Sequence, residues 1–388
     1  MIARALMAAA CLVAAAVPLY AQSIFNSAGI GLPVEALDGR ARALGSFGIG
    51  LQGPGLLPTD PAAAARLLLP TGVIAVQPSW VELSEDGTGD RTYFTGTRFP
   101  LLALAYPVPG GIMTLHASSF FDQRYRGERT VDVVLGGATV PVTDVFVQEG
   151  SISSLGLGYA RMVGASTSVG VSIGRYSGTV FRQLRRDYGA ATGAVEPYQS
   201  NGSWRYSGES ITGGVATDLI GAVRLAASAT WSTDLTADAT GLTESGDRSF
   251  RIPLQLRVGA SSVLTPGLSL SASAMRADWS GTGDDVGSSI RAGAVTGVGV
   301  GVEISRVRLF GREAPLRLGY RRTGLPFTLG TEPATERVFS GGLALILNQS
   351  NGVVLATADA GLERGRRAGD VFAEEFWRAT VSLKLSAF

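Results

Sequence analysis

The sequence predicts an all-β protein, a transmembrane antiparallel β-barrel of about 14 strands with an N-terminal hatch, or plug, inside the lumen. The chain of 388 residues begins with an export signal. It is 45% hydrophobic and only 17% charged, yet after that signal no stretch approaches the run of about 18 apolar residues that indicates a membrane-spanning helix. From Thr71 onward, apolar and small polar residues alternate in runs of roughly ten, which is typical of a barrel wall.

Residues 1–21 have the composition of a secretory signal peptide. Arg4 supplies an early positive charge, an apolar run extends from Leu6 to Val17, and the small residue Ala21 precedes Gln22. The run is shorter than the about 20 residues that a spanning helix needs. We therefore expect cleavage after Ala21 and export of the mature chain.

Cys11 is the only cysteine, and it lies within this signal. It could be the acylated cysteine of a lipoprotein, but too little hydrophobic sequence precedes it, which favours an ordinary apolar position. The mature chain then has no thiol for a disulfide or a thiolate metal site. Loss of Arg4 reduces the 33 basic residues to 32, equal to the 32 acidic ones, which argues against nucleic-acid binding. We expect no metal and no cofactor.

Residues 22–70 are predicted to form the hatch. They show no sustained two-residue alternation, and turn-forming residues occur at 53–55 and 58–61. Asp60 is a helix N-cap residue and Pro61 suits the first helical position, so a short helix is expected from Ala62 to Leu69. Such a compact apolar element needs a surface on which to bury itself, and the barrel interior is the nearest one.

Residues 71–388 are predicted to form the barrel wall. Within 222–232, Val223, Leu225 and Trp231 fall on one face, opposite Arg224 and Ser228. The same alternation places Ile252, Leu254, Leu256 and Val258 outward and Arg251 and Arg257 inward. The candidate strands lie near 71–84, 92–107, 111–126, 149–163, 167–184, 203–219, 222–236, 248–263, 266–279, 290–306, 313–324, 336–347, 352–364 and 373–388.

The connections between these strands alternate in length. Short links such as 164–165 and 265–267 suit periplasmic turns, and longer polar links such as 187–202 and 325–335 suit external loops. One insertion, Arg129–Glu149, holds two β-rich pieces around Gly136 and Gly137. We expect it to be an extracellular hairpin that projects from an external loop; as two further wall strands it would raise the count to about sixteen.

Several phrases resemble the family of outer membrane long-chain fatty acid and hydrocarbon transporters. The phrase Ala41–Gly45 is followed by Phe47–Gly50 and then by Asp60–Ala62, where the family has Asn in place of Asp60. Pro253–Trp279 and Pro315–Phe327 resemble two later strand regions of the family. The likeness implies hatch roles for a set of residues near the start of the mature chain: Arg42, Gly45, Gly48, Gly50, Asp60 and Pro61.

The resemblance further implies passive uptake of hydrophobic compounds such as long-chain fatty acids, by movement of the hatch and lateral release through the wall. It implies a monomer in the outer membrane of a Gram-negative-type bacterium. Its partners would be outer membrane lipid and a hydrophobic small molecule or fatty acid. Phe388 resembles the terminal aromatic residue that barrel-assembly machinery uses in outer membrane proteins generally.

The inward basic residues allow two interpretations. They could form a salt-bridge lattice that holds the hatch, with Glu35, Asp38 and Asp60 as the hatch carboxylates. Alternatively, one arginine could bind a substrate carboxylate through its planar guanidinium, and Arg317 and Arg321 are the candidates for this substrate-binding role.

Two other functions remain open beside transport. A barrel of the same fold could serve as an interaction or anchor component of a secretion or surface assembly. A barrel-resident enzyme or a general porin is the third possibility. His116, the sole histidine, would need a nucleophile and an orienting acid to act as a catalytic base, so we expect no enzyme. The glycine series 293–301 lacks the Lys-Ser/Thr of a phosphate loop, which favours close wall packing or a kink.

Overall fold

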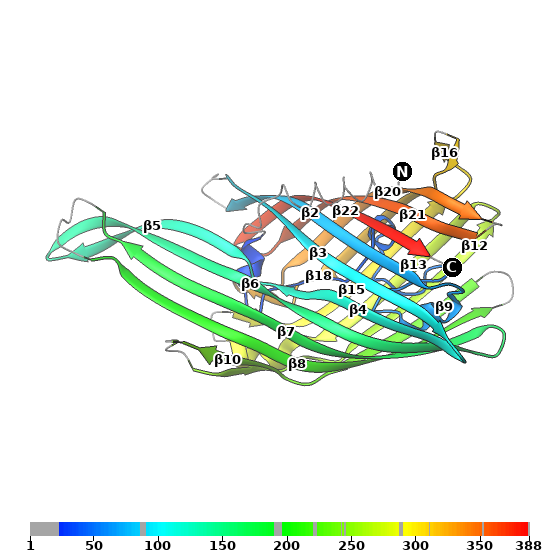
Figure 1. Cartoon of the computed structure of the whole chain (residues 1–388). Coiled ribbons are helices and arrows are strands. Elements are labelled where there is room, and N and C mark those ends of the chain that lie inside the picture. Colours follow the sequence, from blue (N-terminus) through cyan, green and yellow to red (C-terminus); the bar gives the residue numbers. More distant parts are fainter. Residues whose placement is uncertain are drawn as a thin grey trace.

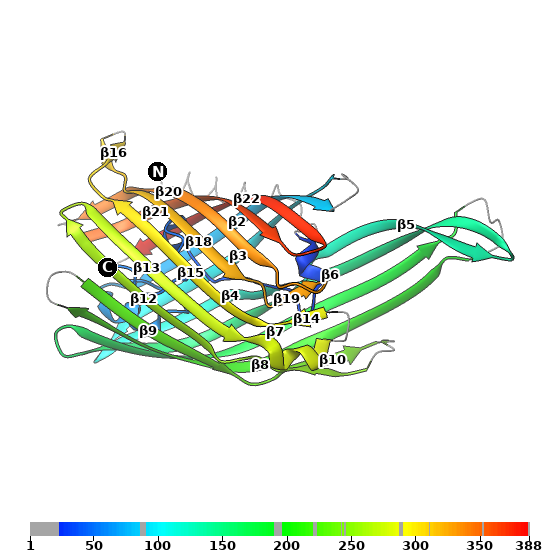
Figure 2. The same cartoon turned by 180° about the vertical axis from the view of Figure 1, so that it is seen from behind.

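Fourteen antiparallel strands close into a barrel (Figures 1 and 2). The computed structural model describes residues 23–85, 91–189, 196–219, 223–241, 243, 246–286, 290–309, 311–350 and 353–386. The predicted signal peptide and Phe388 lie outside these residues. The wall strands are β2 (Thr71–Glu85), β3 (Arg91–Val108), β4 (Gly111–Asp122), β6 (Ala138–Val163), β7 (Thr167–Asp187), β8 (Tyr198–Leu219), β9 (Val223–Ser232), β12 (Gln255–Thr265), β13 (Leu268–Asp278), β15 (Ala294–Ile304), β18 (Leu316–Gly324), β20 (Thr335–Ser350), β21 (Val353–Ala368) and β22 (Phe372–Ser386).

Shorter elements precede the wall or join its strands. The segment before β2 contains η1 (Ile24–Ser27), β1 (Leu32–Pro33), α2 (Gly39–Ala43) and η2 (Pro61–Arg66). The connecting elements are β5 (Tyr125–Leu135), β10 (Leu235–Thr240), β11 (Arg248–Phe250), η4 (Trp279–Thr282), α3 (Gly283–Val286), β14 (Ile290–Ala292), β16 (Arg308–Leu309), β17 (Arg312–Glu313) and β19 (Phe327–Leu329). Within the described ranges, no helix is both long and apolar enough to cross a membrane.

The wall strands alternate as their sequence predicts. Leu256 and Val258 are 45% and 55% exposed on the outer face, whereas Arg257 between them is 6% exposed. Leu102 and Leu104 likewise point outward, while Leu101 packs inward against the segment that precedes β2. Apolar side chains outside and polar or packed ones inside are the pattern of a barrel in a lipid bilayer.

The predicted assignment of residues to the inner and outer faces is wrong at one place. Ile252 is buried in an interior cluster, and Arg251 is exposed. Residues 251–254 are not in a strand, because the wall region breaks into β11 and β12 around Pro253. Proline cannot donate a ladder hydrogen bond, and the alternation restarts after it.

The chain enters and leaves the wall at the same end of the barrel. Thr71 of β2 pairs with Ser386 of β22, which closes the sheet. The tight connection between β12 and β13 lies at this end, as does the two-residue link between β3 and β4. We call this the short-turn end and the opposite one the long-loop end.

The predicted insertion is a hairpin that extends the wall. β5 pairs with the first part of β6 from Tyr125↔Gln148 to Leu135↔Ala138. Gly136 and Gly137 form its turn with φ values of 57° and 87°, which glycine adopts without strain. Together with β7 and β8, this hairpin projects well beyond the rest of the barrel (Figures 1 and 2). The alternative of sixteen wall strands is therefore wrong, because β5 does not join the closed barrel.

Residues 23–70, which we call the N-terminal segment, lie inside the barrel (Figure 1). Wall glycines let its backbone approach closely. A Cβ built on Gly299 would stand 2.0 Å from the carbonyl oxygen of Gly45, and one on Gly301 would stand 2.4 Å from that of Leu44. The glycine series 293–301 therefore includes positions of close packing, as predicted.

We predict that Gly299→Val displaces the N-terminal segment. The added side chain would overlap the Gly45 carbonyl, and such overpacking costs about 1–3 kcal/mol. Thermal unfolding and limited proteolysis of the detergent-solubilised protein measure the loss. The matched control is Gly213→Val in β8, where no atom lies within 4 Å of an added Cβ. Equal melting and equal protease resistance of Gly299→Val and wild type would contradict the prediction.

Candidate functional site

A cavity of about 150 Å³ lies between the N-terminal segment and the wall. Its lining has an aromatic part, a part rich in hydroxyl groups and a part rich in arginine. The N-terminal segment contributes residues 32–36, Arg42, Phe47, Pro58 and Thr59. An apolar surface with a few convergent polar groups is the usual form of a small-molecule site.

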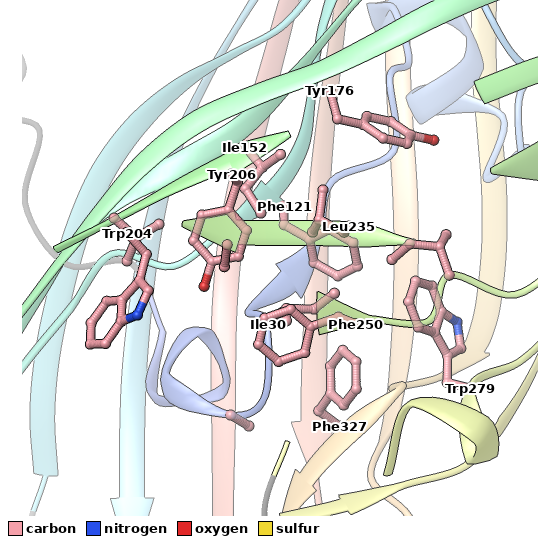
Figure 3. Close-up of a cluster of buried hydrophobic side chains, with 14 of the residues drawn as sticks. Ile30, Phe121, Ile152, Tyr176, Trp204, Tyr206, Leu235, Phe250, Trp279 and Phe327 are labelled. Carbon is pink, nitrogen blue, oxygen red and sulfur yellow. The ribbon is translucent and has the colours of Figure 1, made fainter. Parts of the chain in front are cut away.

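The aromatic part belongs to a buried cluster near the long-loop end. Phe120 stacks on Tyr176 with ring centroids 4.1 Å apart, and Phe121 meets Trp279 edge-on at 5.5 Å. Phe327 lies 5.6 Å from Trp279. Figure 3 shows Phe121, Trp279 and Phe327 turned toward one another beside Ile30 of the N-terminal segment.

The hydroxyl part lies on consecutive wall strands from β4 to β9. Thr212 and Thr230 share a hydrogen bond of 3.0 Å, and the phenol of Tyr176 lies 3.0 Å from Ser232 Oγ. Their inward positions follow from the two-residue period of each strand. The serines and threonines of these strands that line the cavity are Ser118, Ser119, Ser154, Ser172, Ser210, Thr212 and Thr230.

Arginines face the cavity from several directions, and their partners differ. Arg257 donates from Nη2 to Gln255 Oε1 at 3.0 Å and to Glu35 Oε2 at 3.5 Å. Arg98 on β3 is 7% exposed and lines the same cavity. Among the described residues, no hydrogen bond or ion pair reaches its guanidinium, and its Nε is buried without a partner.

A buried lattice of charges lies beside this cavity on β18, β20, β21 and β22. Arg378 holds Glu363 with two hydrogen bonds of 2.7 and 3.0 Å. Arg367 bridges Glu336 at 2.8 Å and Glu374 at 3.1 Å. The lattice comprises Arg42, Arg321, Arg367 and Arg378 with Glu336, Glu363 and Glu374. A buried network in which most groups have a hydrogen-bond or ion-pair partner is rigid, and removing one group strongly lowers stability.

The structure places Arg321 in this lattice and Arg317 in a neighbouring cluster. Arg321 Nη2 lies 3.2 Å from Glu336 and 3.3 Å from Glu363, and its guanidinium stands over the Phe47 ring at 5.7 Å. Arg317 lies 2.6 Å from both Glu303 and Asp359. Arg321 borders the cavity, whereas Arg317 borders a separate hollow of about 450 Å³ at the short-turn end.

Side chains at both ends of the N-terminal segment contact wall charges. Ser23 Oγ donates to Glu374 at 2.7 Å, and the backbone N–H of Ile24 donates to the same carboxylate at 2.7 Å. Arg40 holds Glu303 with contacts of 3.0 and 3.1 Å. Near β2, Arg66 forms an ion pair with Asp218.

The predicted hatch carboxylates are less important for this attachment than expected. Glu35 does contact the wall arginine Arg257. Asp38 instead caps α2 by accepting from the N–H of Ala41 at 2.8 Å. Most ion pairs between the segment and the wall are made by basic side chains of the segment, Arg40, Arg42 and Arg66.

The predicted hatch residues occupy distinct positions in the segment. Gly45, Gly48 and Gly50 have φ values of 61°, 73° and 70°, a region in which other residues are strained. Asp60 accepts from the N–H of Ala63 at 3.2 Å and from that of Gly50 at 3.1 Å, and Pro61 begins η2. The sequence thus predicts the cap, although the helix is 3-10 and ends at Arg66.

Burial perturbs two charges of the segment. It lowers the pKa of the Arg42 guanidinium to about 9, against the attraction of Glu363. Burial also raises the pKa of the Asp60 carboxyl, against the two N–H groups that donate to it. Burial therefore disfavours the charged form of both groups, and their partners favour it.

The ladder between β3 and β4 is incomplete. It extends only from Val108↔Gly111 to Leu101↔Ser118. Beyond Pro100, which has no N–H to donate, β3 pairs with β2 alone, and Phe121 on β4 pairs with Pro33 of the N-terminal segment. We call this interruption the β3–β4 seam. Ser119 Oγ donates across it to the Phe99 carbonyl at 3.0 Å.

His116 lies on the inward face of β4 and also lines the cavity. Among the described residues, no hydrogen bond links it to a serine or a carboxylate, as a catalytic triad requires. The described residues also contain no group of three potential metal ligands arranged to hold a metal ion.

Sequence reasoning missed several residues of the site. Glu374 lies on the same face of β22 as Arg378, and the two-residue alternation of that strand could have revealed it. Arg367 follows Glu363 on the same face of β21. Arg98 lies next to a register shift between β2 and β3, where the two-residue alternation of inward and outward side chains does not hold.

Solved structures share the fold over nearly the whole chain. The Pseudomonas putida toluene transporter TodX aligns with a TM-score of 0.61 at 13% identity, covering 91% of this chain and 99% of that one. The Ralstonia pickettii toluene transporter TbuX aligns with a TM-score of 0.60 at 14% identity, covering 92% and 99%. A Pseudomonas aeruginosa FadL homologue gives 0.59 at 13% identity, covering 92% and 98%. No family model and no curated protein matches the sequence.

We predict that Glu363→Gln strongly destabilises the protein. The change leaves Arg378 and its neighbours without their buried carboxylate, which typically costs about 3–5 kcal/mol. Chemical unfolding of the detergent-solubilised barrel measures this loss. The matched control is Glu375→Gln, because Glu375 pairs with Arg364 on the exposed outer surface, where such pairs contribute about 0–1 kcal/mol. Similar losses in the two variants would contradict a structural role for the lattice.

Proposed function

We propose that this barrel is an outer membrane transporter for the passive uptake of hydrophobic compounds such as long-chain fatty acids. The N-terminal segment acts as the hatch, and the β3–β4 seam is the lateral exit. One observation carries the proposal: the cavity beside the N-terminal segment is lined by Arg98, Ser118 and Ser119, which stand on both sides of the seam.

The route avoids returning an apolar molecule to water. A compound that reaches the cavity from the long-loop end is held against Phe120, Phe121 and Trp279. Burial of apolar groups is favourable by about 0.8 kcal/mol per CH₂, so direct escape through the lumen to the periplasm is costly. Passage through the seam transfers the compound from the cavity into the hydrocarbon of the bilayer.

The hatch role rests on where the N-terminal segment lies. It occupies the lumen beneath the cavity and packs against wall glycines. Pro33 of β1 pairs with Phe121 next to the seam. A shift of β1 would therefore alter both the cavity and the adjoining wall, which couples the hatch to the exit.

The exposed apolar wall and the likeness to transport barrels support placement in an outer membrane. Because the first wall strand begins and the last one ends at the short-turn end, that end faces the periplasm and the hairpin β5–β6 is extracellular. A single closed chain has no open sheet edge in its wall, which suits a monomer.

A role in a surface or secretion assembly is the second candidate. The projecting hairpin favours it, because none of the cavity-lining residues lies between 125 and 148. The free edge of β5 could pair with a partner strand. Removal of 129–144 distinguishes the candidates, since transport through the cavity does not require the hairpin tip.

We predict that deleting residues 24–65, with the signal peptide kept, opens the barrel. Without the segment, the lumen loses the chain that fills it. Planar-bilayer recordings should then show large steady conductance, whereas the intact protein should show none. The matched control lacks 129–144 and should stay closed. Large steady conductance of the intact protein would refute the hatch.

We predict that a bulky group on the outside of the seam blocks uptake. Phe99 and Leu102 are 49% and 48% exposed on the outer face of β3, but only Leu102 lies where β3 pairs with β4. Labelling Phe99→Cys with a large maleimide should reduce fatty acid uptake to near the rate of the membrane alone. Labelling Leu102→Cys should leave uptake unchanged. Equal uptake by the two labelled variants would exclude the seam as the exit.

A further inference from the structure

Arg98 is an uncompensated cation at the edge of the cavity. Its side chain is 7% exposed, and its Nε is buried without a hydrogen-bond partner. Among the described residues, no carboxylate lies within ion-pair distance of its guanidinium, unlike those of Arg257, Arg317 and Arg321. Arg98 lines the cavity.

Asp122, the carboxylate that attracts Arg98, does not form an ion pair with it. Both oxygens of Asp122 are held by Arg124, at 2.9 Å from Nε and 2.9 Å from Nη2. The backbone N–H of Arg124 donates to Asp122 as well, at 3.1 Å. Asp122 is thus fully engaged, and Arg98 gains only a distant attraction from it.

The lattice does not supply a spare carboxylate either. Its three carboxylates are shared by four guanidiniums, and Glu374 also accepts from Ser23 and Ile24. Removing an unpaired charge from water is expensive unless an opposite charge comes with it. A ligand anion in the cavity would provide that charge.

The surface next to Arg98 is aromatic. Ser119 bonds to the carbonyl of Phe99, the residue after Arg98, so the start of the Ser118–Phe121 stretch lies directly across the seam. Phe120 in that stretch stacks on Tyr176, and Phe121 meets Trp279. An anionic group at Arg98 would therefore have an aromatic surface beside it and the hydroxyls of Ser118 and Ser119 close by.

The size of the cavity limits what can occupy it. About 150 Å³ is the volume of a protein cavity that holds a benzene-sized molecule. A long alkyl chain would extend beyond it. A neutral ring would fit the aromatic part but would leave Arg98 unpaired.

We propose that the cavity selects a compact aromatic carboxylate, with the carboxylate on Arg98 and the ring against the Phe120–Tyr176 and Phe121–Trp279 pairs. This inference rests on the proposed transport function and names the substrate class of the same site. A planar guanidinium binds a carboxylate through two parallel hydrogen bonds, which gives orientation as well as affinity.

The test is binding of benzoate, methyl benzoate, toluene and hexadecanoate to the purified full-length barrel at neutral pH, measured by calorimetry. Benzoate should bind at least about tenfold more tightly than methyl benzoate, because only benzoate carries the charge that Arg98 lacks. Equal or tighter binding of the ester would overturn the inference.

Three variants locate the effect. Arg98→Gln should weaken benzoate binding about ten- to hundredfold and should not weaken toluene binding. Arg98→Lys should recover part of the affinity, since it keeps the charge but loses the planar guanidinium that makes two parallel hydrogen bonds. Arg257→Gln, which lines the same cavity but alters an already paired arginine, should have the smaller effect. Unchanged benzoate affinity in Arg98→Gln would refute the role of Arg98, and unaltered thermal unfolding shows that each variant is folded.

The inference and the proposed function fail in different ways. If toluene or hexadecanoate binds and benzoate does not, the aromatic carboxylate is excluded while hydrophobic transport stands. If none of the probes binds, both are excluded.

Discussion

A closed barrel of fourteen strands encloses more space than its own inward side chains can fill, since about eight strands suffice for a filled interior and sixteen or more leave a channel. The N-terminal segment occupies that space. Its backbone reaches the wall because glycines such as Gly299, Gly301 and Gly259 carry no Cβ where the segment touches the wall. The position of the cavity, the attachment of the segment and the seam all depend on this contact.

Charge then holds the segment in the lumen, mainly with the sign opposite to the expected one, although Glu35 pairs with Arg257 as expected. The segment presents Arg40, Arg42 and Arg66 to carboxylates of the wall, while Asp38 and Asp60 serve mainly to cap its own short helices. As a result, one side of the lumen is polar and the other is aromatic. The arrangement gives a hydrophobic molecule one apolar surface and one charged boundary inside the same cavity.

The features that the sequence predicts are those that local rules determine. Strand positions follow from the two-residue period, as in Val223–Ser232, and the cap of η2 follows from Asp60 and Pro61. The phase error at Ile252 arises because Pro253 interrupts the wall. Partners such as Glu336 for Arg367 depend on the register between neighbouring strands, and the missing partner of Arg98 depends on the whole closed sheet. One sequence without the closed sheet does not specify them, and the seam is likewise a property of β3 and β4 together.

The contact between Ser23 and Glu374 joins positions 351 residues apart. Glu374 lies on β22, the last strand, which also pairs with β2 to close the wall. The first residues of the N-terminal segment therefore gain their partner only once the whole chain has been made. Because such distant contacts impose a large loop-closure entropy before they give any stability, closure of this barrel is intrinsically slow. The same link makes the two ends of the chain interdependent: a chain that lacks its final strand also lacks the carboxylate that holds its beginning.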